Sequence, residues 1–244
     1  MGAKTVVLLH GWGFHGGIWE DFAHPLRETG REVHIVNLPG HGSAPMSDPS
    51  LEGFVSHVQE SVPTGAMWVG WSLGGVVAMS AAASSGTVGA LTLIGTSPRF
   101  TIGAGWPHAM APERLTELET SIQQEWHSAW SRFLILQLRG LDNTTVRRLR
   151  TEMLAYPPSQ DALTAGLQIL RNTDLRSQLS KITCPVSVVL GGKDPLVPVE
   201  ISVDLSKLCP HWKISCLPSA GHLPFLTHPA EVLSQIVVYN LSST

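Results

Sequence analysis

The chain has 244 residues, of which 43% are hydrophobic and 14% charged, a composition typical of one globular domain with room for an inserted subdomain. Its net charge of −3 excludes the strongly basic surface of a nucleic-acid-binding protein. It has no apolar run of about 18 residues that could cross a membrane, and Met1 stands too close to the first predicted strand for a signal peptide, so we expect a cytoplasmic protein that binds neither nucleic acid nor membrane.

The first part of the chain alternates short apolar runs with longer amphipathic stretches. Residues 6–9 are apolar without polar alternation, which predicts a strand buried on both faces, as in a parallel sheet. In chain order we expect strand 6–9, helix 18–29, strand 33–37, helix 50–62, strand 66–69, helix 73–84 and strand 88–94. Strands that alternate with helices at this spacing predict an α/β protein with a doubly wound, mostly parallel sheet.

Residues 107–176 depart from this pattern, because they hold no strand-like run and their apolar residues recur at helical spacing. We therefore predict a helical cap (lid) of residues 107–176, inserted in a core formed by residues 1–106 and 177–244. The core resumes with strand 186–190, helix 199–208, strand 212–217 and a closing helix 229–240.

The sequence Gly70-Trp71-Ser72-Leu73-Gly74 stands between a predicted strand and a predicted helix. A G-x-S-x-G pattern in this context is typical of a nucleophile elbow, a turn so tight that the residues two before and two after the serine must lack side chains. The strained turn exposes the serine hydroxyl, and the helix N-terminus behind it favours developing negative charge. We therefore predict that Ser72 is a nucleophile.

Asp194 and His222 stand in loops that follow two later predicted strands, at the edge of an α/β sheet where sites form. A serine hydroxyl needs a base to take its proton, a histidine can take it and then protonate the leaving alcohol, and an aspartate can hold that histidine in the required tautomer. We predict a catalytic triad of Ser72, Asp194 and His222. The rival acids Asp174 and Asp204 are expected on helical segments.

A glycine-rich loop, His10-Gly11-Trp12-Gly13, follows the first predicted strand. Beside an elbow serine, such a loop is expected to supply an oxyanion hole, with the amide of Trp12 as one donor and the amide of Leu73 as the other. The Trp12 side chain would line the acyl pocket, and His10 would order the loop by hydrogen bonds. The sequence has no HExxH or similar metal spacing, so we expect neither a metal nor another cofactor.

Five short motifs of the chain resemble those of the α/β-hydrolase superfamily: H-G-W-G, L-P-G-H-G, G-W-S-L-G-G, G-G-K-D-P-L-V-P and A-G-H-L-P-F. The order Ser, Asp, His is also that of this superfamily. The sequence is most similar to the BioH group, the pimeloyl-acyl-carrier-protein methyl ester esterases of biotin synthesis. The features that carry this resemblance are Trp12, Trp71, Thr96-Ser97-Pro98, the cap run 132–137, and residues 166–170 with 174–176.

The resemblance implies a serine carboxylesterase that hydrolyses the methyl ester of pimeloyl-acyl carrier protein and releases methanol. The expected partner is an acyl carrier protein, and the enzyme is expected to be a monomer. The residues expected to contact the substrate are Trp12, Ser72, Leu73, Phe133, Leu134, Ile135, Leu136, Gln137 and His222.

The cap also contains a local reversal of the chain's acidic character. Between Trp126 and Thr151 one aspartate, Asp142, stands among five arginines: Arg132, Arg139, Arg147, Arg148 and Arg150. Carrier proteins are acidic, so a basic cap face would steer such a partner and set its orientation. Alternatively, these arginines form a solvated helix face and cover apolar surface with their stems.

Three other functions are compatible with the sequence. The first is a general short-chain carboxylesterase or lactonase, which would act equally on esters with and without a carrier. The second is a C–C hydrolase or lyase of the same superfamily, which would form no acyl-enzyme. The third is a non-catalytic ligand-binding module, which the intact triad argues against. Fold alone does not choose among them.

Overall fold

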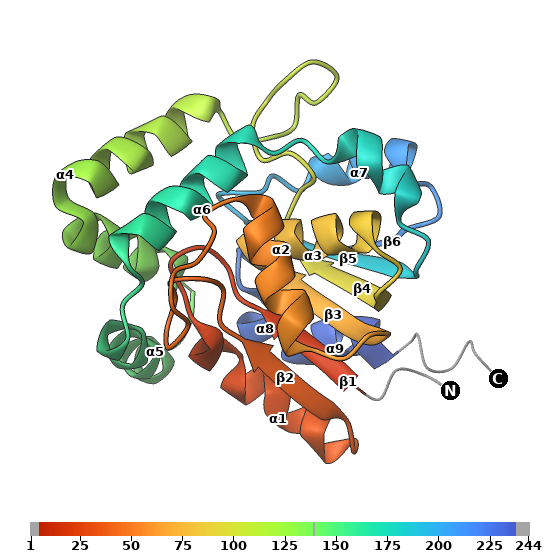
Figure 1. Cartoon of the computed structure of the whole chain (residues 1–244), viewed down its shortest axis with the longest axis horizontal. Helices are drawn as coiled ribbons and strands as arrows, with labels where there is room; N and C mark the ends of the chain where they lie inside the picture. The colour runs from red at the N-terminus through yellow and green to blue at the C-terminus, as the bar shows by residue number, and fades with distance from the viewer. Residues whose placement is uncertain (1–4, 139, 238–244) are drawn as a thin grey trace.

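The computed structural model describes residues 5–138 and 140–237, and within them a six-stranded sheet forms the centre of the molecule (Figure 1). The strand pairs are parallel, and the order is β2-β1-β3-β4-β5-β6. The strands are β1 Thr5–Leu9, β2 Glu32–Val36, β3 Ala66–Trp71, β4 Val88–Ile94, β5 Val186–Gly191 and β6 Lys213–Leu217. The predicted α/β sheet is confirmed, and each predicted strand is present with its ends displaced by two residues or less.

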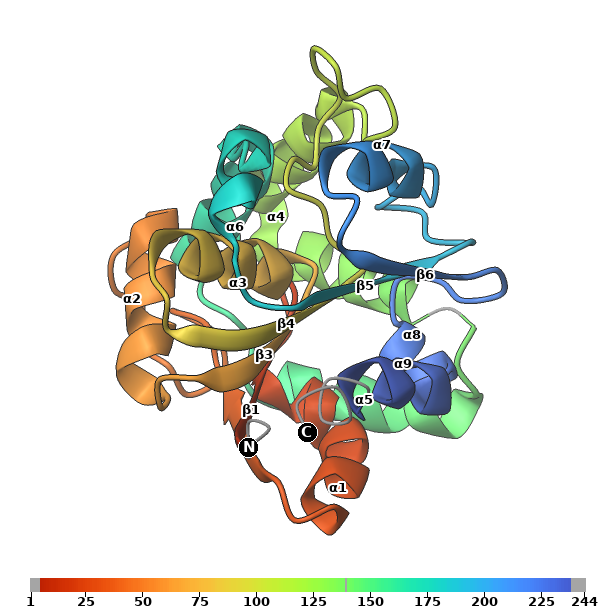
Figure 2. The same cartoon turned by 90° about the vertical axis from the view of Figure 1, so that its right-hand side faces the viewer.

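Helices cover both faces of the sheet (Figure 2). One face carries α1 Glu20–Glu28, α8 Pro224–Thr227 and α9 Pro229–Val237, and the other carries α2 Leu51–Ser61, α3 Leu73–Ser84 and α7 Ile201–Leu208. Because helices bury both faces, β3 and β5 are buried along their whole length. This double burial explains why the strands are continuous apolar runs instead of alternating ones.

Two predicted helices differ from the observed ones. The helix expected at 18–29 begins as a separate 3-10 turn, Gly16–Trp19, which the ring nitrogen Nδ1 of His15 caps by accepting the amide of Gly17 at 3.1 Å. The closing helix expected at 229–240 is α9, whose last three predicted residues lie outside the described residues. No described helix is long and apolar enough to cross a membrane.

Three helices lie between β4 and β5 in the chain, at the position predicted for the cap: α4 Pro112–Gln137, α5 Asn143–Ala155 and α6 Gln160–Asn172. The helix α4 is bent at Glu125, whose φ of −143° and ψ of 63° are not helical, so it forms two arms. Side chains of Asp142 and Ser159 cap the N-termini of α5 and α6. Residues 107–111, predicted within the helical stretch, are not helical, and a short 3-10 helix, η2 (Arg176–Lys181), leads back to the core.

Candidate active site

Ser72 occupies the sharp turn between β3 and α3. Its φ of 54° and ψ of −117° make it the one described residue other than glycine with a positive φ, a conformation that stores about 1–3 kcal/mol of strain. A Cβ at Gly70 would lie 2.5 Å from the carbonyl oxygen of Gly74, and a Cβ at Gly74 would lie 2.5 Å from the carbonyl oxygen of Leu9. The two flanking glycines are therefore required by backbone contacts, as a nucleophile elbow demands.

Hydrogen bonds with β4 and with the loop that follows it hold the elbow in this conformation. The amide of Ser72 donates to the carbonyl of Ile94 at 3.0 Å, and the hydroxyl of Thr96 donates to the carbonyl of Ser72 at 2.8 Å. The Thr96 side chain also packs on Gly75, where a Cβ would lie 2.5 Å from Thr96 Cγ2. From the residues, nothing pointed to Thr96 as the anchor of the elbow, because its partner is distant in sequence.

Asp194 and His222 are joined at the carboxyl ends of β5 and β6. His222 Nδ1 donates to Asp194 Oδ2 at 2.7 Å, and both side chains are almost completely buried. The other carboxylate oxygen, Oδ1, accepts the amides of Leu196 at 2.8 Å and Val197 at 3.0 Å. With its proton on Nδ1, the imidazole keeps Nε2 free to act as a base.

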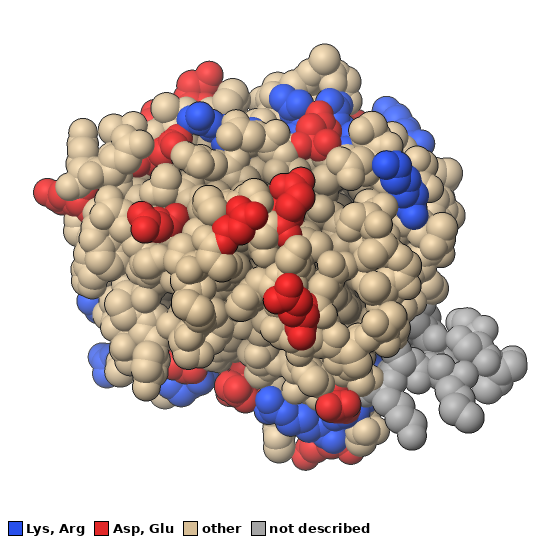
Figure 3. Space-filling model, in the orientation of Figure 1, with Lys and Arg blue, Asp and Glu red and all other residues tan. Residues whose placement is uncertain are grey.

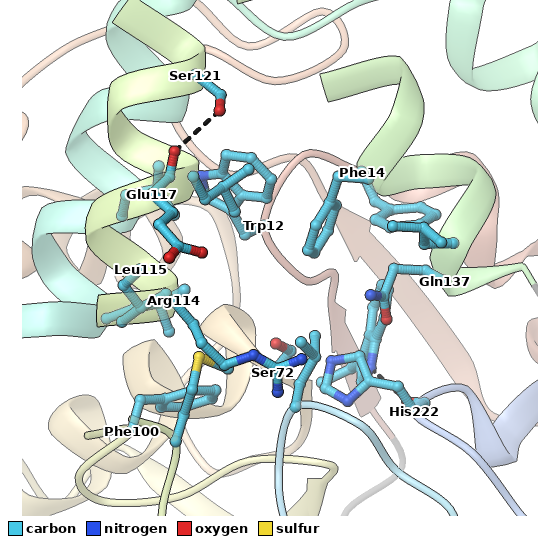
Figure 4. A pocket seen from close by; sticks show the side chains of 18 residues that line it. Trp12, Phe14, Ser72, Phe100, Arg114, Leu115, Glu117, Ser121, Gln137 and His222 are labelled. Atoms are coloured by element: carbon cyan, nitrogen blue, oxygen red, sulfur yellow. Dashed lines mark hydrogen bonds between the residues drawn. The ribbon is translucent and has the colours of Figure 1, made fainter. Parts of the chain in front are cut away.

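The backbone of His222 is fixed as well. The indole of Trp71, the residue before the nucleophile, donates to the carbonyl of His222 at 2.8 Å, and the two rings lie 5.4 Å apart. Figure 4 shows Ser72 and His222 beside each other at the floor of a pocket. The three residues predicted as the triad therefore come together at one edge of the sheet.

The two rival acids have other partners. Asp174 accepts hydrogen bonds from Arg99 at 2.8 Å and Arg176 at 2.6 Å, and the bond from Arg176 holds the pKa of this carboxyl well below its ordinary value. Asp174 lies in the loop after α6, so its expected helical position was wrong. Asp204 lies in α7 as expected, and its carboxylate is bonded to His108 at 2.9 Å.

His10 orders the loop that follows β1. Its Nε2 accepts the amide of Leu38 at 3.0 Å, so Nδ1 carries the proton that it donates to the carbonyl of Gly11 at 2.8 Å. Burial, and then the neighbouring ring of His41, lower the pKa of His10 well below its ordinary value, which keeps this ring neutral. In a trans peptide the carbonyl and the following N–H point in opposite directions. The bond to Gly11 therefore also sets the direction of the Trp12 amide.

The loop lies directly against the nucleophile, since a Cβ at Gly11 would be 3.1 Å from Ser72 Cβ. On the other side of Ser72, Leu73 is the first residue of α3, so its N–H has no acceptor within the helix. The two amides predicted as oxyanion donors, those of Trp12 and Leu73, thus both adjoin Ser72.

A cavity of about 300 Å³ opens above Ser72 (Figure 4). Of the predicted substrate contacts, six line it: Trp12, Ser72, Phe133, Leu136, Gln137 and His222. The side chains of Leu73, Leu134 and Ile135 do not, because Leu73 and Leu134 are buried elsewhere and Ile135 is 40% exposed. Residues 133, 136 and 137 share one face of α4 at helical spacing, whereas 134 and 135 lie on other faces.

The first arm of α4 supplies a polar part of the wall that was not predicted. Arg114, Glu117 and Ser121 lie at spacings of three and four residues, and Figure 4 shows them on the opposite side of the pocket from Gln137. The rest of the wall is mainly apolar: Phe14, Trp71, Phe100, Met110, Leu115, Leu118, Leu167, Leu170 and Leu196.

Residues 6–235 match the sequence profile of the Alpha/beta hydrolase family. The chain belongs to this family. Among its relatives, the pimeloyl-[acyl-carrier protein] methyl ester esterase of Methylococcus capsulatus is 43% identical over 228 residues, 91% of this chain and 89% of that protein. The protein of the same name from Vibrio cholerae is 34% identical over 97% of this chain and 94% of its own length.

A solved structure, an esterase from Exiguobacterium antarcticum, is similar with a TM-score of 0.88 over 99% of this chain and 94% of its own. At 23% identity it supports the fold alone. Together with the six parallel strands and the inserted helices, it confirms the α/β-hydrolase fold predicted from the sequence.

The arginines predicted to dock a carrier protein differ in their surroundings. In this hydrolase Arg148 is ion-paired with Asp21 of α1 and with Glu152 of its own helix. Arg132 donates to Ser128 at 3.3 Å. Arg147 and Arg150 are exposed on α5 and form no ion pair with any described residue, and Arg139 lies outside the described residues. Figure 3 shows basic side chains along the edge of the molecule where α5 lies.

Among residues 5–138 and 140–237, no three His, Cys, Asp or Glu side chains are placed to hold a metal ion.

Proposed function

We propose that this hydrolase is a serine carboxylesterase that hydrolyses the methyl ester of pimeloyl-acyl carrier protein to pimeloyl-acyl carrier protein and methanol, a step of biotin synthesis. The observation that supports it most is the 2.7 Å bond between His222 and Asp194 beside a strained Ser72, beneath a largely apolar cavity. The names of the full-length relatives supply the substrate.

In the first half of the reaction, His222 Nε2 takes the proton of Ser72 as the hydroxyl oxygen attacks the ester carbonyl. The amides of Trp12 and Leu73 donate hydrogen bonds to the oxyanion of the tetrahedral intermediate. When the intermediate collapses, His222 gives its proton to the departing methoxide, methanol leaves, and the acyl group remains on Ser72.

In the second half, a water molecule gives a proton to His222 and attacks the acyl carbonyl. The second tetrahedral intermediate forms in the same oxyanion hole, and its collapse returns the proton to Ser72 and frees the carboxylate. Asp194 stabilises the imidazolium in both halves while its Oδ1 stays bonded to two backbone amides. These two bonds favour the orientation of the carboxylate in which Oδ2 faces His222.

The cavity suits a linear acyl chain. Its walls carry aromatic and aliphatic side chains from the core and from both arms of α4, and each methylene group that leaves water there contributes about 0.8 kcal/mol. The methyl ester would lie at Ser72 and the polymethylene chain along these walls. The other end of the acyl chain, which bears the carrier, would leave toward the cap.

We also propose that the exposed arginines of α5 contribute to carrier binding. Arg147 and Arg150 are free to meet an acidic partner, whereas Arg148 already has two carboxylate partners. The double variant Arg147→Glu and Arg150→Glu is expected to lower kcat/KM for methyl pimeloyl-acyl carrier protein at least tenfold, about 1.4 kcal/mol. Hydrolysis of the free methyl ester of pimelate should not change, and added salt should slow the wild type on the carrier substrate alone.

The test of the function itself compares wild-type kcat/KM on methyl pimeloyl-acyl carrier protein and on free methyl pimelate. A large preference for the carrier-linked ester is expected, and equal rates would identify a general carboxylesterase instead. Labelling of Ser72 by a fluorophosphonate provides the second readout, because a non-catalytic module would not react. A loss on both esters in the double arginine variant would show that the substitutions disturbed the cap and not carrier binding.

A further inference from the structure

The loop that carries the oxyanion donor Trp12 is bonded to the cap as well as to the core. From the cap, the indole N–H of Trp130 in α4 donates to the carbonyl of Gly13 at 2.6 Å. In the other direction, the indole N–H of Trp12 donates to the carbonyl of Leu163 in α6 at 2.8 Å. Two hydrogen bonds of opposite direction therefore join residues 12 and 13 to two different cap helices.

The contacts around both indoles leave little room for movement. Gly13 has a φ of 74°, and a Cβ at this position would lie 3.0 Å from Trp130 Cδ1. A Cβ at Gly166 of α6 would lie 2.5 Å from Trp12 Cδ1, and the Trp12 ring also meets Phe133 edge to face at 4.7 Å. Trp130 is completely buried and Trp12 is 3% exposed.

Because both bonds are buried, losing either of them would destabilise the present conformation of the loop. A carbonyl that loses its donor in a buried site costs about 1–3 kcal/mol unless it moves to find another partner. The core holds the loop at the Gly11 carbonyl, through His10 and the amide of Phe14 at 3.3 Å. The Gly13 carbonyl, two residues further on, receives its side-chain donor from the cap. The Trp12 amide lies between these two anchors.

We propose, on the basis of the serine esterase function above, that Trp130 is a positioning residue of the reaction. By holding the Gly13 carbonyl it keeps the loop in the conformation in which the Trp12 amide faces the oxyanion of the intermediate. The core sets the direction of the Trp12 amide through the Gly11 carbonyl, and the first and third cap helices then hold the rest of the loop in place from the other side. The second donor, the amide of Leu73, belongs to the core helix α3.

The variant that tests this role is Trp130→Phe, which removes the N–H and keeps an aromatic ring in the same place. Removing an oxyanion donor outright lowers kcat by about two to three orders of magnitude; misplacing one of two donors should have a smaller effect. We expect kcat on p-nitrophenyl butyrate to fall about tenfold with KM within a factor of two. This ester needs no carrier, so the result is independent of carrier binding.

An inhibitor provides a readout that a purely structural role would not change. A trifluoromethyl ketone forms a hemiketal on Ser72 whose oxyanion occupies the hole, so its Ki should rise about tenfold, in parallel with the fall in kcat. Gly166→Ala would press on the Trp12 ring and on Leu73 Cδ2, which a Cβ there would meet at 2.5 and 3.1 Å, so it should also raise this Ki without altering Trp130. The control is Trp126→Phe in the same arm of α4, because the Trp126 indole makes no hydrogen bond to any described residue.

Melting temperatures of all variants are measured first, and kinetics are recorded well below the lowest of them. Wild-type kcat and Ki in Trp130→Phe would overturn the inference. So would a rise in KM with unchanged Ki, or an equal loss in Trp126→Phe, since both would indicate general loosening of the cap. If Ser72→Ala were as active as the wild type, the serine mechanism itself would fail, which is a different result from an unaffected Trp130→Phe.

Discussion

Asp194→Asn is expected to leave the fold intact and to abolish most of the activity. Asp194 Oδ1 accepts two backbone amides, from Leu196 and Val197, so an asparagine would turn its oxygen toward them and its NH₂ group toward His222. A donor at that position forces His222 Nδ1 to accept, which places the ring proton on Nε2. With Nε2 protonated, His222 cannot take the proton of Ser72, and kcat should fall by about four orders of magnitude, about 5.4 kcal/mol of activation free energy.

The assay is steady-state hydrolysis of p-nitrophenyl butyrate at saturating concentration, with melting temperature as the measure of folding. The melting temperature should change little, because the two amide bonds and the bond to the imidazole can all be kept. Asp174→Asn and Asp204→Asn are the matched controls, since their carboxylates pair with arginines and with His108. If Asp194→Asn kept a tenth of the wild-type kcat, or if either control lost more, Asp194 would not be the acid of the triad.

Two further predictions concern the nucleophile and a buried histidine. Ser72→Ala should lose about four or more orders of magnitude of kcat while remaining folded, and a variant with a tenth of the activity would contradict the acyl-enzyme mechanism. Burial lowers the pKa of His41 from 6.5 to about 4, so between these values the unfolded chain binds a proton here that the folded chain does not. This group alone should lower the free energy of unfolding by about 3 kcal/mol as pH drops from 7 to 4. Urea unfolding at pH 7, 5.5 and 4 measures this, and His41→Asn should show a shallower dependence; identical slopes would exclude His41 as the cause.

The strands, the elbow at Ser72 and the meeting of Asp194 with His222 were predictable from sequence patterns. The elbow helix begins at Leu73 and ends at Ser84, as predicted, since the glycines that permit the turn and the small residues that follow are adjacent in sequence. Asp194 and His222 were predictable because parallel strands bring their carboxyl ends to one edge. The closeness of these two residues follows from that topology, so no further sequence motif was needed to predict it.

The walls of the pocket were predictable only in part. No proline or glycine marks the bend of α4 at Glu125 in the sequence, yet the bend brings Arg114 and Phe133 to the same cavity. The bonds of Trp71 to His222 and of Trp12 to Leu163 each span 151 residues, and the bond of Arg99 to Asp174 spans 75. The periodicity of a sequence contains no information about such distant pairs. The sequence therefore gave no sign that Asp174, expected on a helix, lies in a loop where two arginines bind it.

The core and the cap supply different parts of the active site, so substitutions in the two should affect catalysis differently. Ser72, Asp194 and His222, the proposed triad, stand after β3, β5 and β6 of the core, whereas the two arms of α4 supply a large part of the pocket wall. Substitutions at Leu136 or Glu117 can therefore alter which acyl chain is bound without touching the proton transfers. Trp130 differs from these residues because its partner is the oxyanion loop. If Trp130 positions the oxyanion donor as proposed, a substitution there should lower the rate for every ester instead of altering the preference among them.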